Sequence, residues 1–98
     1  MTEKSSPVTI FIDGTSISVT GILDGTTLPE LNRSVIEFFE RATASEIDVL
    51  TLDLSTVSAC DQAASAAVRH AQSVCAERAV ALRVVPSEAV RQVMAPRR

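Results

Sequence analysis

The stretch IDVLTLDLSTVSACDQAASAAVRHAQSVCAE, residues 47–77, decides the fold that this sequence predicts. It begins with a short apolar run in which Val49, Leu50, Leu52 and Leu54 are separated by few polar residues. A run this dense predicts a strand that is covered on both faces. It ends with apolar residues at positions 64, 68, 71 and 75, a helical spacing that predicts one stripe of small side chains. The stretch therefore predicts a buried strand, a short turn and a helix lying close to a sheet.

The turn around residues 60–63 is the segment in which we expect function. Asp61 can cap the helix, because its carboxylate can accept a hydrogen bond from a free N–H of the first turn. Several polar residues fall mostly off the apolar stripe and are expected to face outward. They are Gln62, Ser65, Arg69, Gln72 and Ser73.

The rest of the chain predicts three further strands and two further helices. Residues 1–7 form a polar leader, and residues 8–98 form a single domain. Strands are predicted at 8–13, 16–23 and 80–85, and Asp13-Gly14 predicts a hairpin that supplies an antiparallel edge. Thr26 or Thr27 is expected to cap the helix that follows the hairpin, and Ser87 to cap a last short helix that Pro96 ends.

The first of these helices has an apolar stripe that we expect to pack on the sheet. Its members are Leu28, Leu31, Val35, Phe39 and Ala42, widened by Ile36 and Phe38. A polar connection, residues 41–46, follows. The element order β-β-α-β-α-β-α predicts an α/β fold with a mixed four-stranded sheet, on which right-handed crossovers pack the helices.

Composition excludes several classes of function. The chain has 98 residues and a net charge of −3, without a basic run, so nucleic acid is not an expected partner. No apolar stretch is long enough to cross a membrane and residues 1–7 lack a signal-peptide core, so we expect a cytoplasmic protein. Cys60 and Cys75 lie too far apart along the chain's predicted helix for an internal disulfide. One histidine and no CxxC pair predict no metal site.

Nothing in the sequence indicates catalysis. The one histidine, His70, lies mid-helix off the apolar stripe and is expected to be a solvated surface residue. Cys60 stands at a helix start, where a thiol pKa can be lowered, but no base is identifiable for it, and a small buried cysteine that closes the strand is the favoured interpretation. The three glycines form no phosphate-binding pattern. We therefore expect no enzyme and no cofactor.

Three segments together resemble STAS domains, the fold of anti-sigma factor antagonists. GILDGTTLPEL (21–31) resembles the stretch after their second strand. VLTLDLSTVSACDQAASAAVRHAQ (49–72) resembles their central strand, turn and helix, and RVVPSEAVRQVM (83–94) resembles the strand and helix near their end. The resemblance covers roughly residues 8–94, with the three pieces in the family's order.

The resemblance implies a site and a function. In that family the turn reads Asp-Ser-Ser-Gly, and its second serine is phosphorylated by a kinase that is also the anti-sigma factor. Here the turn is Asp61-Gln62-Ala63-Ala64, so the phospho-acceptor position falls on Ala63, which has no hydroxyl. The implied function is an anti-sigma factor antagonist that binds a serine-kinase type anti-sigma factor whether or not that kinase is active. The implied partner-binding residues are Ser58, Cys60, Asp61, Gln62, Ala63, Ala64, Ser65 and Arg69.

Alternatives stay open for the switch and for the function. Ser65 could take the switch role if the alignment slips by two, and Ser55, Thr56 and Ser58 are expected in the turn, where they could be modified. Cys60 could make the surface redox-sensitive. A structural subunit of a stressosome-like or lipid-transport-like assembly is the alternative function, and an enzyme or nucleotide binder is a third. The short C-terminus leaves room for a homodimer.

Overall fold

The computed structural model describes residues 8–41 and 47–95. The elements are β1 (Val8–Asp13), β2 (Ser16–Leu23), α1 (Leu28–Arg41), β3 (Val49–Cys60), α2 (Ala63–Glu77), β4 (Ala81–Pro86) and α3 (Glu88–Met94). The predicted α/β class and element order are confirmed. The predicted leader, residues 42–46 of the predicted polar connection and Pro96 lie outside the described residues. Arg41, which was expected to begin that connection, is instead the last residue of α1.

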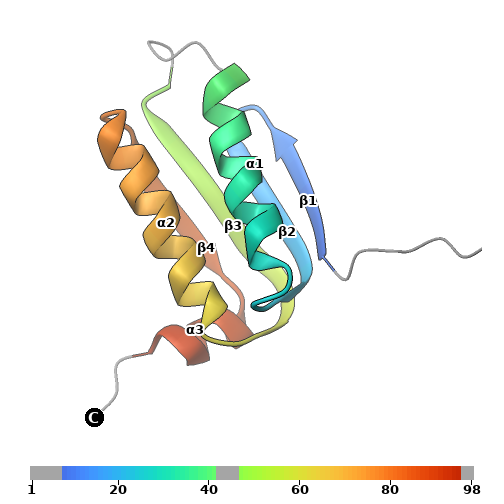
Figure 1. The fold of residues 1–98 in the computed structure, drawn as a ribbon. Coiled ribbons are helices and arrows are strands. Elements are labelled where there is room, and N and C mark those ends of the chain that lie inside the picture. Colours follow the sequence, from blue (N-terminus) through green and yellow to red (C-terminus); the bar gives the residue numbers. More distant parts are fainter. Residues whose placement is uncertain (1–7, 42–46, 96–98) are drawn as a thin grey trace, which may run out of the picture.

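The four strands form one mixed sheet in the order β1-β2-β3-β4 (Figure 1). β1 and β2 pair antiparallel as the predicted hairpin, with Asp13 opposite Ser16 across a two-residue loop. Gly14 is the first loop residue and has a φ of 61°, which is the conformation that a type II′ hairpin turn requires there. β2, β3 and β4 run parallel to one another. Each parallel step needs a crossover, which α1 and α2 supply.

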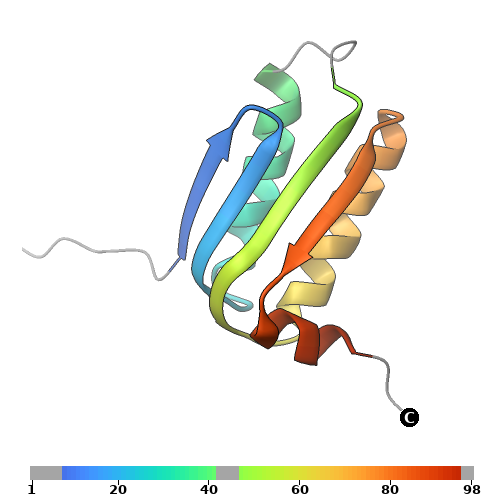
Figure 2. The same ribbon diagram turned by 180° about the vertical axis from the view of Figure 1, so that it is seen from behind.

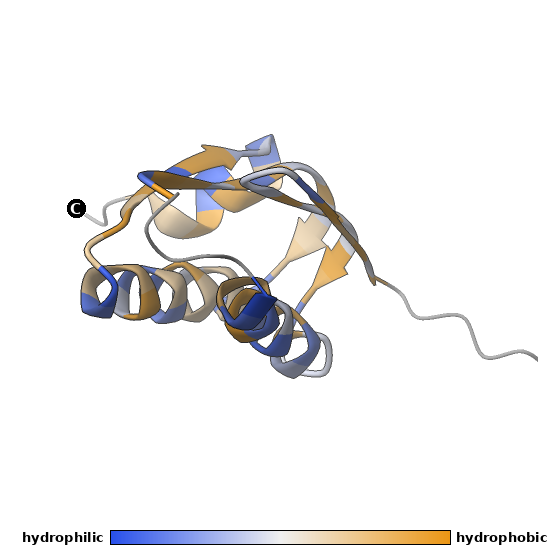
Figure 3. Ribbon diagram, turned by 90° about the horizontal axis from the view of Figure 1, so that it is seen from above, coloured by the Kyte–Doolittle hydropathy of each residue, from blue (hydrophilic) through white to orange (hydrophobic). Residues whose placement is uncertain are grey.

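Both long helices lie on the same face of the sheet (Figures 1 and 3). The strand order explains this arrangement, because the steps from β2 to β3 and from β3 to β4 go in the same direction. Two right-handed crossovers in one direction put their helices on one side. The opposite face carries no helix across its middle (Figure 2).

The prediction that the central strand is covered on both faces is therefore wrong. Leu50, Leu52 and Leu54 are fully buried under the helices. Their neighbours point the other way, where Val49 is 38% exposed and Thr51 is half-buried. The run looked continuous because an apolar residue, Val49, happens to begin the open side of the strand.

The core lies between the sheet and the helices. From α2, all four residues of the predicted stripe are buried, and their small size lets the helix lie close to the strands. From α1, Leu31, Val35, Phe38 and Phe39 are buried, and the two phenylalanine rings pack edge-to-face at 5.1 Å. Ile36, which was expected to widen this stripe, is instead 40% exposed. It lies one residue past Val35, which turns it about 100° away from the stripe toward solvent.

The caps differ in how closely they follow the predictions. Ser87 caps α3 as expected, since its Oγ accepts a hydrogen bond from the Val90 N–H at 3.2 Å. Thr27 stands at the start of α1, where its carbonyl accepts from the Glu30 N–H at 3.1 Å. Its hydroxyl does not turn to the helix, however, but donates to the Ile22 carbonyl at 2.9 Å. The side chain of Thr27 thus stabilises the turn before α1 and does not cap the helix.

Candidate partner-binding site

The candidate site lies at the end of the sheet where β3 leads into α2, near α3 (lower part of Figure 1). The Asp61 N–H donates to the Leu23 carbonyl at 3.4 Å, which holds the β3–α2 turn beside the turn that follows β2. Val90 of α3 is fully buried and joins the core there. Three segments far apart in the sequence therefore support one exposed rim.

β3 is longer than expected, and this sets where the site begins. Ser55, Thr56 and Ser58 were predicted in the turn, but all three lie in the strand. The β2–β3 register shifts twice, between Ser18 and Thr20 and between Gly21 and Ile22, so that β3 has an extra residue at each place. The side chains of Thr56 and Ser58 bond to β2, and that of Ser55 bonds to Asp53 in the same strand, so this part of β3 does not form a loop.

Two hydroxyl groups of β3 donate hydrogen bonds to β2 where the register between the two strands shifts. Thr56 Oγ1 donates to the Val19 carbonyl at 2.9 Å and lies 2.8 Å from Thr20 Oγ1. Ser58 Oγ donates to the Gly21 carbonyl at 3.2 Å. These bonds explain why a serine- and threonine-rich segment that resembles a turn continues as a strand as far as Cys60.

Asp61 caps α2 much as the sequence predicted. Its Oδ1 accepts a hydrogen bond from the Ala63 N–H at 2.8 Å. By backbone geometry Gln62 holds the N-cap position, and its side chain makes no cap bond. A carboxylate thus lies at the positive end of the α2 dipole, one residue before the N-cap residue, where it stabilises the first turn.

The structure divides the predicted partner-binding residues into three groups by exposure. Exposed are Ser58, Asp61, Gln62 and Arg69, and half-buried are Cys60 and Ser65. Ala63 is 9% exposed and Ala64 is fully buried, so both belong to the core side of α2. A partner at this rim would touch the first two groups, and Ala64 supports the surface from beneath without contacting the partner.

Ala63 is the first residue of α2. Its N–H is held by Asp61, and its methyl group is almost completely enclosed. The position offers no hydroxyl to a kinase. A side chain much larger than alanine would have to displace its neighbours or turn outward over the rim, and the second outcome would change the surface a partner would meet.

Cys60 does not have an activated thiol. Burial raises the pKa of its Sγ above the ordinary value, and the neighbouring Asp61 carboxylate raises it further. A raised pKa leaves less thiolate at neutral pH, and the thiolate is the form that reacts with oxidants. The raised pKa gives no support to the alternative of a redox-sensitive surface, which stays a prediction. Cys60 ends β3 as expected, but it is half-buried and not buried as the favoured interpretation had it.

Two features escaped the sequence analysis. In the turn after β2, Asp24 Oδ1 accepts from the Thr26 N–H at 2.9 Å and from Thr26 Oγ1 at 2.7 Å, and these bonds lower the pKa of Asp24. The signal was present in the Asp-Gly-Thr-Thr run, which favours such a turn.

The second feature is His70. It is half-buried, not solvated as expected, and its Nδ1 is enclosed without a hydrogen-bond partner among the described residues. Spacing along the helix alone did not reveal the neighbours that cover it.

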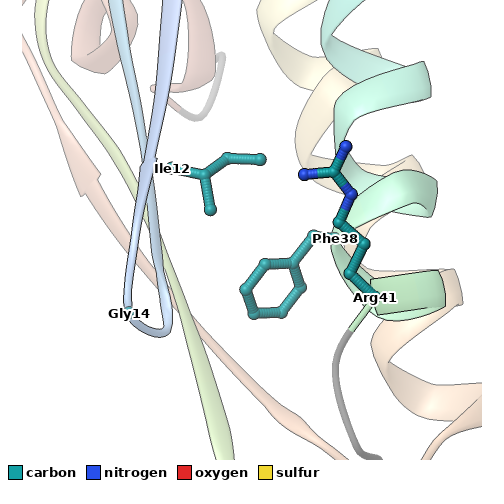
Figure 4. A pocket seen from close by; sticks show the side chains of 4 residues that line it. All are labelled: Ile12, Gly14, Phe38 and Arg41. Carbon is teal, nitrogen blue, oxygen red and sulfur yellow. The ribbon is translucent and has the colours of Figure 1, made fainter.

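A small cavity lies at the other end of the molecule, away from the predicted site (Figure 4). It has a volume of about 190 Å³ and is lined by Ile12, Gly14, Phe38 and Arg41, between the β1–β2 hairpin and the end of α1. Clefts that enclose small-molecule substrates usually span about 300–1,000 Å³, so this one does not define a substrate site.

Neither a metal-binding cluster nor a membrane-spanning helix is present in the part of the chain that the structure describes. Within residues 8–41 and 47–95, no group of three or more histidine, cysteine, aspartate or glutamate side chains could hold a metal ion. In the same part of the chain, no helix is both long and apolar enough to cross a membrane.

Comparison with known proteins supports the fold alone. No protein-family model matches the chain. No curated protein matches it either. Among solved structures, the fold is similar to that of a crystal structure of Mglu, with a TM-score of 0.59 and 12% sequence identity over 84% of this chain. The matching region spans only 20% of the Mglu chain, so the same arrangement of strands and helices also occurs as a small part of a longer polypeptide.

Proposed function

We propose that this chain is a regulatory protein-binding module of the STAS type, an anti-sigma factor antagonist. It binds an anti-sigma factor of the serine-kinase type through the β3–α2 turn and the exposed flank of α2, and thereby frees a sigma factor in the cytoplasm. One observation carries the proposal. Ala63, which aligns with the family's phospho-acceptor serine, is the first residue of α2 and directly follows the exposed Asp61 and Gln62 of the rim, although its own methyl group faces the core.

The chemistry of this rim supports binding that ignores phosphorylation. A phosphoserine carries a charge of about −1.5 to −2 and would repel an acidic or apolar partner surface. Ala63 stays neutral and small, as an unmodified serine would be. Exposed Gln62 directly before it, and exposed Arg69 six residues further along α2, offer polar groups to a partner. The anti-sigma factor would therefore bind this chain in the presence of ATP as well as in its absence.

The test measures binding of the purified chain to the anti-sigma kinases encoded with it in the same genome, with and without ATP. We expect a one-to-one complex with one of them whose affinity ATP does not change. Arg69→Glu should weaken the complex at least tenfold, since Arg69 is exposed and its replacement leaves the core intact. Ala76→Glu, an exposed change at the far end of α2, is the matched control and should bind as the unchanged chain does.

A second substitution tests the role of position 63. Ala63→Ser restores a hydroxyl at the aligned position, and we expect the kinase to phosphorylate it and ATP then to weaken binding. Circular dichroism checks that the variant folds. If no anti-sigma factor binds the unchanged chain, the proposal fails. If one binds but Arg69→Glu has no effect, the function stands and the proposed surface is wrong.

A structural role in a larger assembly is the second candidate. It is favoured by the observation that a similar fold forms only a fifth of the Mglu chain, so the architecture can serve as one part of a larger protein. In this case the chain would purify from cells within a complex of several subunits that contains no sigma regulator. Size-exclusion chromatography of the native extract, followed by mass spectrometry, separates this outcome from the first.

A further inference from the structure

The open face of the sheet carries side chains in rows that cross all four strands. The register of the sheet defines one row as Phe11, Ser18, Asp53 and Val85, from β1 to β4. It defines the neighbouring row as Asp13, Ser16, Thr51 and Arg83. All eight residues alternate with helix-facing residues such as Ile17 and Leu52, which are fully buried. Within residues 8–41 and 47–95, no helix crosses the middle of this face (Figure 2).

At its two edges, this face carries exposed apolar and charged side chains that a partner could contact. Phe11 on β1 is 62% exposed, although the chain has only three aromatic residues. Asp13 on β1 and Arg83 on β4 are both exposed, and neither has an ion-pair partner among the described residues. They belong to the same row but stand at opposite edges, three strand spacings or about 14 Å apart. They therefore cannot pair within one chain.

We propose that this face binds a second copy of the chain, face to face, about a two-fold axis that runs along the strands between β2 and β3. The axis reverses the strand order and keeps the position along each strand, so that β1 of one copy lies over β4 of the other. The row of Asp13 and Arg83 then meets itself reversed, which sets each Asp13 against the Arg83 of the other copy. The row of Phe11 and Val85 likewise sets each Phe11 against the other copy's Val85.

This pairing is self-complementary in charge and in polarity. Two equivalent Asp–Arg pairs and two equivalent Phe–Val contacts form, as a two-fold interface requires. In the middle, Ser18 faces Asp53 of the other copy, which matches a hydroxyl donor with a carboxylate acceptor. Packed sheets lie about 10 Å apart, a gap that the long Arg83 side chain can cross at the edges. The short serine and threonine side chains between leave room for bridging water.

The size of the face sets the expected strength. Four strands at about 4.8 Å spacing and about six residues of length cover an area of roughly 19 by 20 Å, or about 400 Å² for each copy. A standard stable interface covers about 800 Å² for each partner. The dimer is therefore weak and forms at micromolar or higher concentrations. It leaves the β3–α2 turn free, and the inference does not depend on the proposed function.

The test is sedimentation equilibrium of the full chain between about 10 µM and 1 mM, a range that covers weak dimers. We expect a monomer–dimer equilibrium. Arg83→Asp alone sets two aspartates against each other at each edge, and Asp13→Arg alone sets two arginines against each other. Each should weaken dimerisation at least tenfold, since like charges at an interface are unfavourable. Arg33→Asp on the outer side of α1 is the control for a charge reversal and should not weaken the dimer.

The decisive arm mixes the two variants. An equimolar mixture of Arg83→Asp and Asp13→Arg chains restores an opposite-charge pair at both edges and should form a heterodimer as strong as the original dimer. A chain that is monomeric throughout the range overturns the proposal. So does a dimer that both reversals leave unchanged, which would point to pairing through the edge of β1 instead. Reversals that weaken the dimer without recovery in the mixture overturn the two-fold arrangement.

Discussion

The two faces of the sheet differ in what their side chains specify. On the helix side, the strands contribute Val, Leu and Ile residues that are almost fully buried and determine which way the sheet faces. On the open side, the same strands carry a mixture of serine and threonine, charged residues such as Asp13 and Arg83, and a few apolar residues such as Phe11. Because successive side chains of a strand point to opposite faces, the residues of both faces alternate in one stretch of sequence. The difference shows that the buried face of a strand is recognised by counting apolar residues at every second position, and not by the total number of apolar residues in the run.

The sharpest way to test this comparison is a matched pair in β3. Leu52→Ala removes a fully buried side chain under the helices and should lower the free energy of unfolding by about 3 kcal/mol. Thr51→Ala, one residue earlier on the open face, should change it by less than about 0.5 kcal/mol. Urea unfolding followed by circular dichroism measures both. Equal losses from the two variants would mean that the open face is covered after all.

A smaller effect of opposite sign is expected where the chain returns from the helix layer to the sheet. After α2, Ala79 has a φ of 58°, a left-handed conformation that costs alanine free energy and glycine little. The Val80 N–H donates to the Cys75 carbonyl at 2.9 Å, which holds this helix end in place. Ala79→Gly should therefore stabilise the protein by up to about 1 kcal/mol in the same urea assay. Ala76→Gly, inside the helix, should destabilise it by about 1 kcal/mol.

The smallest effect concerns a carboxylate on the open face and appears only in acid. Asp53 Oδ1 accepts hydrogen bonds from Ser55 Oγ at 2.6 Å and from the Ser55 N–H at 3.0 Å, and these lower the pKa of Asp53 below its ordinary value. The folded state thus favours the ionised form, so this contribution to stability is complete above the ordinary pKa of about 3.9. It is lost as the pH falls through the lowered pKa.

Stability measured by urea unfolding at pH 6, 4 and 3 checks this prediction. Asp53→Asn should make the loss between pH 6 and pH 3 smaller than in the unchanged chain, because one carboxylate no longer takes up a proton on unfolding. Asp48→Asn, an exposed change just before β3, serves as the comparison. An unchanged slope in Asp53→Asn would show that the bonds from Ser55 contribute nothing to stability.

The order of elements and the stripe of α2 were predictable because they depend on local periodicity and on turn residues. The capping role of Asp61 was predictable for the same reason, since a carboxylate just before a helix can accept a hydrogen bond from the free N–H groups of the first turn. The length of β3 was not predictable, because Ser55, Thr56 and Ser58 favour turns in isolation, and the carbonyls that accept from the Thr56 and Ser58 hydroxyls belong to β2. The burial of His70 and the exposure of Ile36 depend on how the elements pack against one another. The periodicity of residues within one helix carries no information on that packing.

The candidate site was predicted in position more than in detail. The exposed rim at the start of α2 follows from the strand–turn–helix pattern together with the family resemblance. That pattern placed Ala64 on the buried stripe, but it did not show that Ala63 also faces the core, because Ala63 is the first residue of the helix and lies outside the predicted stripe. Nor did it show that the Cys60 thiol has a raised pKa, since burial is a property of the whole fold.

The sheet order β1-β2-β3-β4 also has a consequence for synthesis. Each new strand joins the edge made by the strand before it, so no strand must enter between two that are already paired. A ribosome that releases the chain from its N-terminus adds the strands in the order in which the finished sheet holds them. At every stage the growing edge is the newest strand, and each crossover helix is already made when the strand it delivers emerges.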